Sequence, residues 1–199
     1  MQIVCLDLEG VLVPEIWINV AEKLGIEALK KTTRDIPDYD ELMRYRLDLI
    51  AKHDITLSYI KEVIAELVPL EGAKDFLDEL RGHFQVAILS DTFYEFAQPL
   101  MRQLGFPMLL CHKLVVDPKS DQIVDYRLRQ SNPKRQAVLA FKQLYYRVFA
   151  AGDSFNDLSM LQEADAGAFL HAPESIASQF PQLPAFNEYS ELLAFFKQH

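Results

Sequence analysis

The amino-acid sequence predicts an α/β fold, a mostly parallel and doubly wound sheet with a small helical cap inserted after the first strand. Two observations support this fold class. From residue 72 onward, short apolar runs typical of buried strands alternate with amphipathic stretches typical of helices, which favours a parallel sheet covered on both faces. Residues 14–68 instead contain three helical patterns in succession. We therefore expect an α/β core from residues 1–13 and 69–199, and a helical cap from residues 14–68.

Composition narrows the classes of function. The chain has 199 residues, half of them hydrophobic, and a formal net charge of −9 with no block of lysine or arginine. Nucleic-acid binding needs a basic stripe, so we expect no nucleic-acid partner. No apolar run reaches the length of a membrane span, and the N-terminal residues do not resemble a signal peptide. Cys5 and Cys111 sit in apolar runs as expected for buried thiols. These features predict a cytoplasmic protein, and a homodimer is compatible with them.

The first third of the chain predicts one strand and the cap. The apolar run "QIVCLDL" predicts a buried strand over residues 2–8. Apolar residues at helical spacing then follow three times, with Thr56 in position to cap the third helix. We expect the cap helices at residues 14–25, 38–52 and 56–67.

The rest of the chain predicts the remaining strands and helices in alternation. Residues 113–129 alternate in polarity around "DPKSDQ" and predict a hairpin. We expect strands at residues 84–90, 108–113, 147–152 and 166–171. We expect helices at residues 72–83, 91–105, 132–146, 156–164 and 187–198.

Polar side chains gather at the predicted strand ends, where open α/β sheets bind ligands. Asp7 and Glu9 have the i, i+2 spacing that places two side chains on one side of a strand. The other polar groups are Ser90, Asp91, Lys134, Asp153, Asn156 and Asp157. Each has an ordinary structural explanation by itself, such as a solvated strand end, a helix cap or a surface lysine. Together, carboxylates, a hydroxyl and a lysine suit Mg²⁺ and a phosphate group.

These residues resemble the four motifs of the haloacid-dehalogenase superfamily. The motifs are Asp7-Leu8-Glu9-Gly10, Ser90, Lys134 and "GDSFND". The helical insert and "GDSFNDLSML" are similar to the phosphoserine phosphatase branch. "CLDLEGVLVPEIW", "TTRDIPDYD", "LSDTFYEFAQPLMRQLGFP" and "PKRQ" further resemble a group of bifunctional phosphoserine phosphatase/homoserine phosphotransferase enzymes.

The resemblance implies a fold, a reaction and a role for each residue. It implies a Rossmann-like core, hydrolysis of phosphoserine through a phosphorylated Asp7, and transfer of the phosphoryl group to homoserine. Mg²⁺ would be held by Asp7, Asp153 and the Glu9 carbonyl, and Asp157 would orient the waters of the metal or Lys134. Ser90, Lys134 and the Asp91 amide would bind the phosphate group, and Asn156 would contact substrate.

Three further residues complete what the resemblance implies. Glu9 would act as the acid and base, although most of the superfamily has Asp there. Glu15 and Arg46 would bind the ammonium and carboxylate groups of the substrate. Each of these two residues also has a structural alternative. Glu15 lies in the first turn of a helix, where carboxylates are favoured, and Arg46 could form a surface ion pair with an acidic neighbour. For the whole chain, the alternatives are a phosphatase of another small phosphomonoester, such as a sugar or nucleotide, and a receiver-like phospho-accepting module.

Overall fold

The computed structural model describes residues 1–32, 35–36 and 38–199. Thr33, Arg34 and Pro37, which belong to the stretch "TTRDIPDYD", lie outside the described residues. Within the described residues, the strands form one sheet in the order β4-β3-β2-β1-β5-β6-β7, parallel throughout except for the antiparallel pair β3–β4. The strands are β1 (Gln2–Leu6), β2 (Gln85–Phe93), β3 (Met108–Val116), β4 (Ile123–Arg127), β5 (Arg147–Gly152), β6 (Ala166–Leu170) and β7 (Ala185–Phe186).

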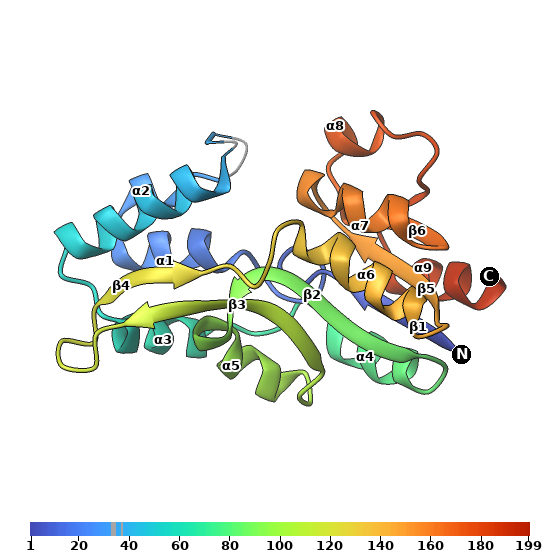
Figure 1. Ribbon diagram of the computed structural model, residues 1–199, viewed down its shortest axis with the longest axis horizontal. Helices are drawn as coiled ribbons and strands as arrows, with labels where there is room; N and C mark the ends of the chain where they lie inside the picture. The colour runs from blue at the N-terminus through green and yellow to red at the C-terminus, as the bar shows by residue number, and fades with distance from the viewer. Residues whose placement is uncertain (33–34, 37) are drawn as a thin grey trace.

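Helices cover both faces of the sheet, which confirms the doubly wound fold (Figure 1). One face packs against α4 (Ala73–Arg81), α5 (Tyr94–Gln103) and α9 (Tyr189–Gln198), and the other against α6 (Pro133–Gln143) and α7 (Leu158–Glu163). Successive residues of a strand point to opposite faces, so Val4 and Cys5 enter two different apolar clusters. Apolar residues are therefore required at every buried position of β1, from Ile3 to Leu6.

The helices between β1 and α4 rest on the β3–β4 hairpin. They are α1 (Ile16–Leu24), the 3₁₀ helix η1 (Glu27–Lys30), α2 (Tyr39–Lys52) and α3 (Leu57–Ala65). Figure 1 shows the hairpin running between α2 and α3. The hairpin turn holds the α2–α3 connection, because the Leu57 amide donates to the Asp121 carbonyl (2.9 Å) and Gln122 Nε2 donates to Asp54 Oδ1 (2.7 Å). The apolar side chains of these helices join the cluster that contains Val4 and Leu6 of β1, so the core on this face of the sheet extends into residues 14–68.

Two of the predicted boundaries that were wrong lie at the site. β1 ends at Leu6 rather than at residue 8, although the Asp7 amide still donates to the Ala151 carbonyl of β5 (3.0 Å). β2 continues to Phe93 through a register irregularity, so α5 begins at Tyr94 instead of residue 91. Apolar periodicity finds buried strands but does not find the irregular turns that end them.

Several short elements complete the structure. The elements absent from the sequence-based expectations are η1, the 3₁₀ helix η2 (Phe155–Asp157), α8 (Glu174–Ala177) and β7. Each is too short to display a periodic pattern. Among the described residues, no helix is both long enough and apolar enough to span a membrane.

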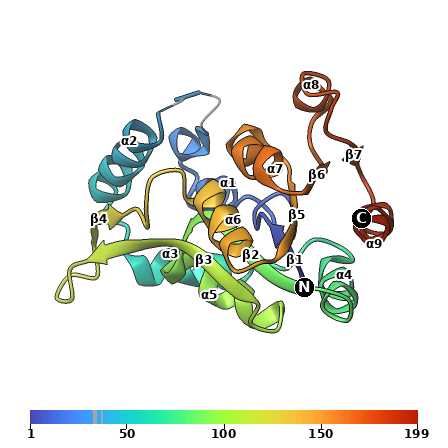
Figure 2. The ribbon, with the colours of Figure 1, turned by 45° about the vertical axis from the view of Figure 1, so that its right-hand side comes forward.

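Strand order determines where the candidate site lies. From β1 the chain builds outward through β2, β3 and β4 on one side, and later through β5, β6 and β7 on the other (Figure 2). The order therefore reverses between β1 and β5, and ligands of open α/β sheets bind at such a switch point.

Candidate active site

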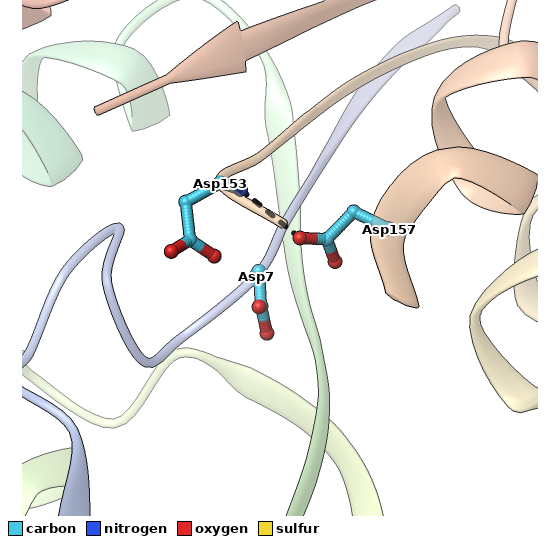
Figure 3. Close-up of side chains that lie close together, drawn as sticks. All are labelled: Asp7, Asp153 and Asp157. Carbon is cyan, nitrogen blue, oxygen red and sulfur yellow. Dashed lines mark hydrogen bonds between the residues drawn. The ribbon is translucent and has the colours of Figure 1, made fainter. Parts of the chain in front are cut away.

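Three buried aspartates meet at the carboxyl ends of β1 and β5 (Figure 3). Asp7 follows β1, while Asp153 and Asp157 follow β5, and none of the three side chains belongs to a residue more than 9% exposed. One oxygen of each carboxylate lies within 4.8 Å of one oxygen of the other two. The sequence expectation that these acids come together is therefore met.

Two glycines allow the loops to approach so closely. Gly10 has a φ of +76°, and a Cβ at this position would overlap the Asp153 carboxylate. A Cβ at Gly152 would overlap the Asp157 carboxylate. Glycine is thus required at both positions for steric reasons, and position 10 also requires it because of the positive φ.

Lys134 joins the aspartates from the first turn of α6. It is 3% exposed, and its Nζ lies 2.6 Å from Asp157 Oδ1 and 3.0 Å from Asp7 Oδ1. Burial acts to lower the pKa of Lys134, but the surrounding carboxylates outweigh it and raise the pKa well above its usual value. The other Asp157 oxygen accepts the amides of Asp153 (3.0 Å) and Ser154 (3.1 Å). Asp157 is therefore used mainly in fixing Lys134 and the β5 loop.

Asp7 and Asp153 carry negative charge that Lys134 does not fully compensate. Burial raises the pKa of Asp7 well above its ordinary range, and the charge of Asp157 adds to this effect. Burial and the same neighbour raise the pKa of Asp153 to about 7. Lys134 supplies one positive charge against three carboxylates. Buried acidic oxygens with uncompensated charge fit a hard divalent cation such as Mg²⁺.

The end of β2 supplies groups suited to an anion. Ser90 Oγ accepts the Thr92 amide (3.2 Å), so its own proton remains available to another acceptor. The Asp91 carboxylate accepts Asn156 Nδ2 (3.0 Å) and lies 3.8 Å from Lys134 Nζ. Burial raises the pKa of Asp91, but Lys134 and hydrogen bonds outweigh it, so the pKa lies below its usual value.

Glu9 reaches toward the first turn of α1. Its Oε2 accepts the Ile16 amide (2.9 Å). Burial and the charge of Glu15 raise the pKa of Glu9 to about 7, against the opposing effects of the Ile16 amide, Arg46 and Thr92. A carboxyl group with a pKa near 7 suits a general acid or base at neutral pH.

A cavity of about 280 Å³ joins these groups to the cap. The predicted site residues on its wall are Asp7, Glu9, Glu15, Arg46, Ser90, Asp91, Asp153 and Asn156. Lys134 contacts this set through Asp7 and Asp91, and Asp157 contacts it through Lys134 and the Asp153 amide. The structure thus brings the whole predicted set together.

Arg46 lies at the cap end of the cavity. It is 8% exposed, so the alternative of a surface ion pair is wrong. Its Nη2 donates to the Lys31 carbonyl (2.8 Å), and its guanidinium lies 4.8 Å from the centre of the Trp17 ring. Its buried Nε has no hydrogen-bond partner among the described residues. Burial lowers the pKa of Arg46 to about 10, so it stays protonated at neutral pH. Glu15 is exposed at the N-cap of α1 and bonds no helical amide through its side chain.

Several polar residues on the cavity wall are not among the predicted site residues, and Thr92 and Tyr39 are two of them. Thr92 lies at the end of β2, and Tyr39 begins α2. The Tyr39 hydroxyl donates to the Asp91 carbonyl (2.8 Å). Thr92 adjoins the motif residue Ser90, which is a signal that was available, whereas nothing in the sequence around Tyr39 indicates this contact.

Solved structures share this fold. A phosphoserine phosphatase in its substrate-bound form has a TM-score of 0.82 at 20% identity, covering 98% of this chain and 97% of that one. A phospho-aspartyl intermediate analogue of phosphoserine phosphatase has a TM-score of 0.81 at 20% identity, covering 98% of both chains. At this identity, the likeness supports the fold.

Sequence comparisons identify the family of this chain. Phosphoserine phosphatase ThrH of Pseudomonas aeruginosa is 66% identical over 192 residues, covering 96% of this chain and 93% of that protein. Phosphoserine phosphatase of Pseudomonas syringae pv. tomato is 63% identical, covering 96% of this chain and 81% of that protein. Residues 1–165 match the family model described as haloacid dehalogenase-like hydrolase. The four motifs, the fold and these matches agree, and the chain belongs to the haloacid dehalogenase-like hydrolases.

Proposed function

We propose that this enzyme hydrolyses L-phosphoserine through a phosphorylated aspartate, depends on Mg²⁺, and also transfers the phosphoryl group to homoserine. One observation carries the proposal: a single cavity has groups for a phosphoryl group at one end and for an amino acid at the other. Asp7 and Ser90 line the first end, and Glu15 and Arg46 line the second. The names of the Pseudomonas relatives support the same substrate.

Asp7, Asp153 and the Glu9 carbonyl would hold the Mg²⁺ ion. The excess negative charge at Asp7 and Asp153 supports this assignment. When bound, the ion reduces the repulsion between an anionic nucleophile and an anionic phosphate group. Asp157 is already engaged by Lys134 and two backbone amides, which supports a role in holding the site in shape.

Asp7 would attack phosphorus, and the serine oxygen would leave. One bond from the Asp7 carboxylate to phosphorus forms as the bond from phosphorus to the serine oxygen breaks. The Ser90 hydroxyl, the Lys134 ammonium and the Asp91 amide would neutralise charge on the phosphoryl oxygens. Lys134 lies 3.0 Å from Asp7, so it also holds the attacking carboxylate in position.

Glu9 would move the proton in both half-reactions. It would protonate the departing serine oxygen, and it would then accept a proton from the water or alcohol that attacks phosphorus. The pKa of about 7 supports both directions at neutral pH. Homoserine carries the ammonium and carboxylate groups that serine carries, so the same cap residues would bind it.

Residues 14–68 would act as a cap that selects the substrate, closing over the core of residues 1–13 and 69–199. Arg46 would bind the carboxylate with its Nε, which has no hydrogen-bond partner in the described part of the chain, and Glu15 would pair with the ammonium. Asn156, whose amide donates to Asp91, would contact the substrate from the core side. We also propose a cytoplasmic location, which the two buried free thiols of Cys5 and Cys111 support.

The test is phosphate release from L-phosphoserine with Mg²⁺, with and without homoserine, beside the Asp7→Asn variant. We expect release that the variant lowers by at least about 10³-fold, and phosphohomoserine when homoserine is present. Release from phosphoserine that Asp7→Asn leaves unchanged would contradict the proposal. Faster turnover of a sugar or nucleotide phosphate would point to the alternative phosphomonoester, and a phosphorylated protein stable for many minutes to the receiver-like module.

A further inference from the structure

The Tyr39 hydroxyl makes a contact between the helical insert and the phosphate-facing end of β2. It donates to the Asp91 carbonyl oxygen over 2.8 Å, although the two residues are 52 positions apart. The Tyr39 ring packs edge-on against His112 (6.0 Å between ring centres) and Tyr126 (6.2 Å). The ring therefore has its own packing partners, and the hydroxyl adds one directed bond.

That bond acts on a peptide group next to Ser90. The Asp91 carbonyl and the Thr92 amide belong to the same planar peptide, and a planar peptide turns as one unit. Tyr39 binds the oxygen at one edge of this peptide, and Ser90 Oγ accepts the N–H at the opposite edge (3.2 Å). The orientation of the plane thus determines where the Thr92 amide meets Ser90.

The Thr92 amide in turn decides what the Ser90 hydroxyl does. A serine hydroxyl has one proton to donate and can accept two hydrogen bonds. While Oγ accepts the Thr92 amide, its proton stays available for an acceptor in the cavity. If the peptide turns, Oγ loses this partner and the hydroxyl is free to rotate.

Tyr39 contacts the backbone carbonyl of Asp91, whereas other residues hold the Asp91 side chain. The carboxylate is held separately, by Asn156 Nδ2 at 3.0 Å and His112 Nε2 at 3.5 Å. His112 Nδ1 accepts the Arg129 amide (3.1 Å), so the neutral ring carries its proton on Nε2, facing Asp91. These contacts place the side chain, but they do not set the plane of the peptide that follows it.

We propose that Tyr39 is a positioning residue for phosphoryl transfer: its hydroxyl holds the Asp91–Thr92 peptide so that Ser90 directs its proton at the phosphoryl group. The inference rests on the proposed phosphatase chemistry and goes beyond it, because Tyr39 acts through Ser90 without touching the reacting atoms. It also ties the position of α2 to the phosphate-binding groups, since Tyr39 is the first residue of that helix.

The test compares Tyr39→Phe with a matched control, Tyr126→Phe. Both remove one hydroxyl and keep a ring, and the Tyr126 hydroxyl donates to Asp40 of the same helix rather than to the Asp91 carbonyl. With Mg²⁺, we expect Tyr39→Phe to lower kcat about tenfold, the equivalent of one hydrogen bond, and to raise KM for phosphoserine only about threefold. We expect Tyr126→Phe to keep kcat within twofold.

Two further measurements separate this inference from a general loosening of the cap. p-Nitrophenyl phosphate has no amino-acid groups, so its kcat should fall in Tyr39→Phe by a similar factor. Binding of inorganic phosphate with Mg²⁺, measured by calorimetry without turnover, should weaken at least threefold in Tyr39→Phe alone.

The outcomes distinguish two failures. Unchanged kcat and unchanged phosphate binding in Tyr39→Phe would overturn the role of Tyr39, as would equal losses in Tyr126→Phe. A wild-type enzyme that ignores phosphoserine would overturn the proposed substrate instead, and the phosphate-binding comparison would still decide the role of Tyr39.

Discussion

At the scale of single residues, the site combines groups whose burial would be unfavourable alone. Asp7, Asp157 and Lys134 are each at most 5% exposed, and an isolated buried charge is costly. Here each carboxylate lies within 3.0 Å of the Lys134 ammonium. The fold thus maintains charged groups in a buried site, where they act strongly on a phosphoryl group.

Arg46 gives the sharpest prediction at this scale. Arg46→Ala should raise KM for phosphoserine about 10- to 100-fold, because a charge-assisted bond contributes about 1.5–3 kcal/mol. Phosphoethanolamine lacks the carboxylate, so its KM should stay within about threefold. The matched control is Arg44→Ala, two positions away on α2, whose partner is the half-exposed Asp125 (2.6 Å). Steady-state kinetics of both variants with both substrates measure the difference. Equal changes in KM for phosphoserine and phosphoethanolamine in Arg46→Ala would refute the carboxylate contact.

At the scale of elements, the loop after β1 is shaped by Gly10. Gly10→Ala should lower kcat at least about 100-fold, because the new Cβ displaces the Asp153 carboxylate, and should lower stability by about 1–2 kcal/mol from the left-handed backbone. Gly25→Ala is the control. Its φ is +66° with nothing within 4 Å of the added Cβ, so it should lose similar stability and keep its activity. Denaturant unfolding measures the stability of both variants, and phosphate release measures their activity. Equal activity in the two variants would show that the overlap between the added Cβ and Asp153 does not affect catalysis.

The sequence predicts some elements of this fold better than others, for physical reasons. The buried strands and amphipathic helices show clear periodicity, and the acids at 7, 153 and 157 follow from their place at strand ends. The exact turn after Leu6 and the extension of β2 through Thr92 depend on hydrogen bonds with neighbouring strands. The contact of Tyr39 with Asp91 depends on how α2 packs on the hairpin, and no local sequence pattern predicts that packing.

At the scale of the whole molecule, stability should depend on pH and on Mg²⁺ together. In metal-free protein, a folded-state pKa of about 7 for Asp153, against an ordinary 3.8, means that the folded state binds more protons between these values. Its contribution to stability therefore falls as pH rises from about 4 to 7. Metal-free Asp153→Asn should melt at a higher temperature than wild type at pH 8, with a smaller difference at pH 5.

Added Mg²⁺ should reverse that order at pH 8. A ligand that binds only the folded state stabilises it by about 2.7 kcal/mol at 100 times its dissociation constant. Wild-type melting temperature should therefore rise by several degrees, whereas Asp153→Asn should respond weakly because a ligand is lost. Thermal melts with chelator and with Mg²⁺ measure both, and an equal rise in the two proteins would argue against Asp153 as a ligand.

The central claim is that Asp7 takes the phosphoryl group from phosphoserine. The most direct measurement is rapid acid quenching of the enzyme with ³²P-labelled L-phosphoserine and Mg²⁺, followed by peptide mapping. We predict label on the peptide that contains Asp7, released by hydroxylamine as expected for an acyl phosphate, and absent from Asp7→Asn. Phosphate release at full rate with label on another residue, or with no labelled protein at any quench time, would contradict the account.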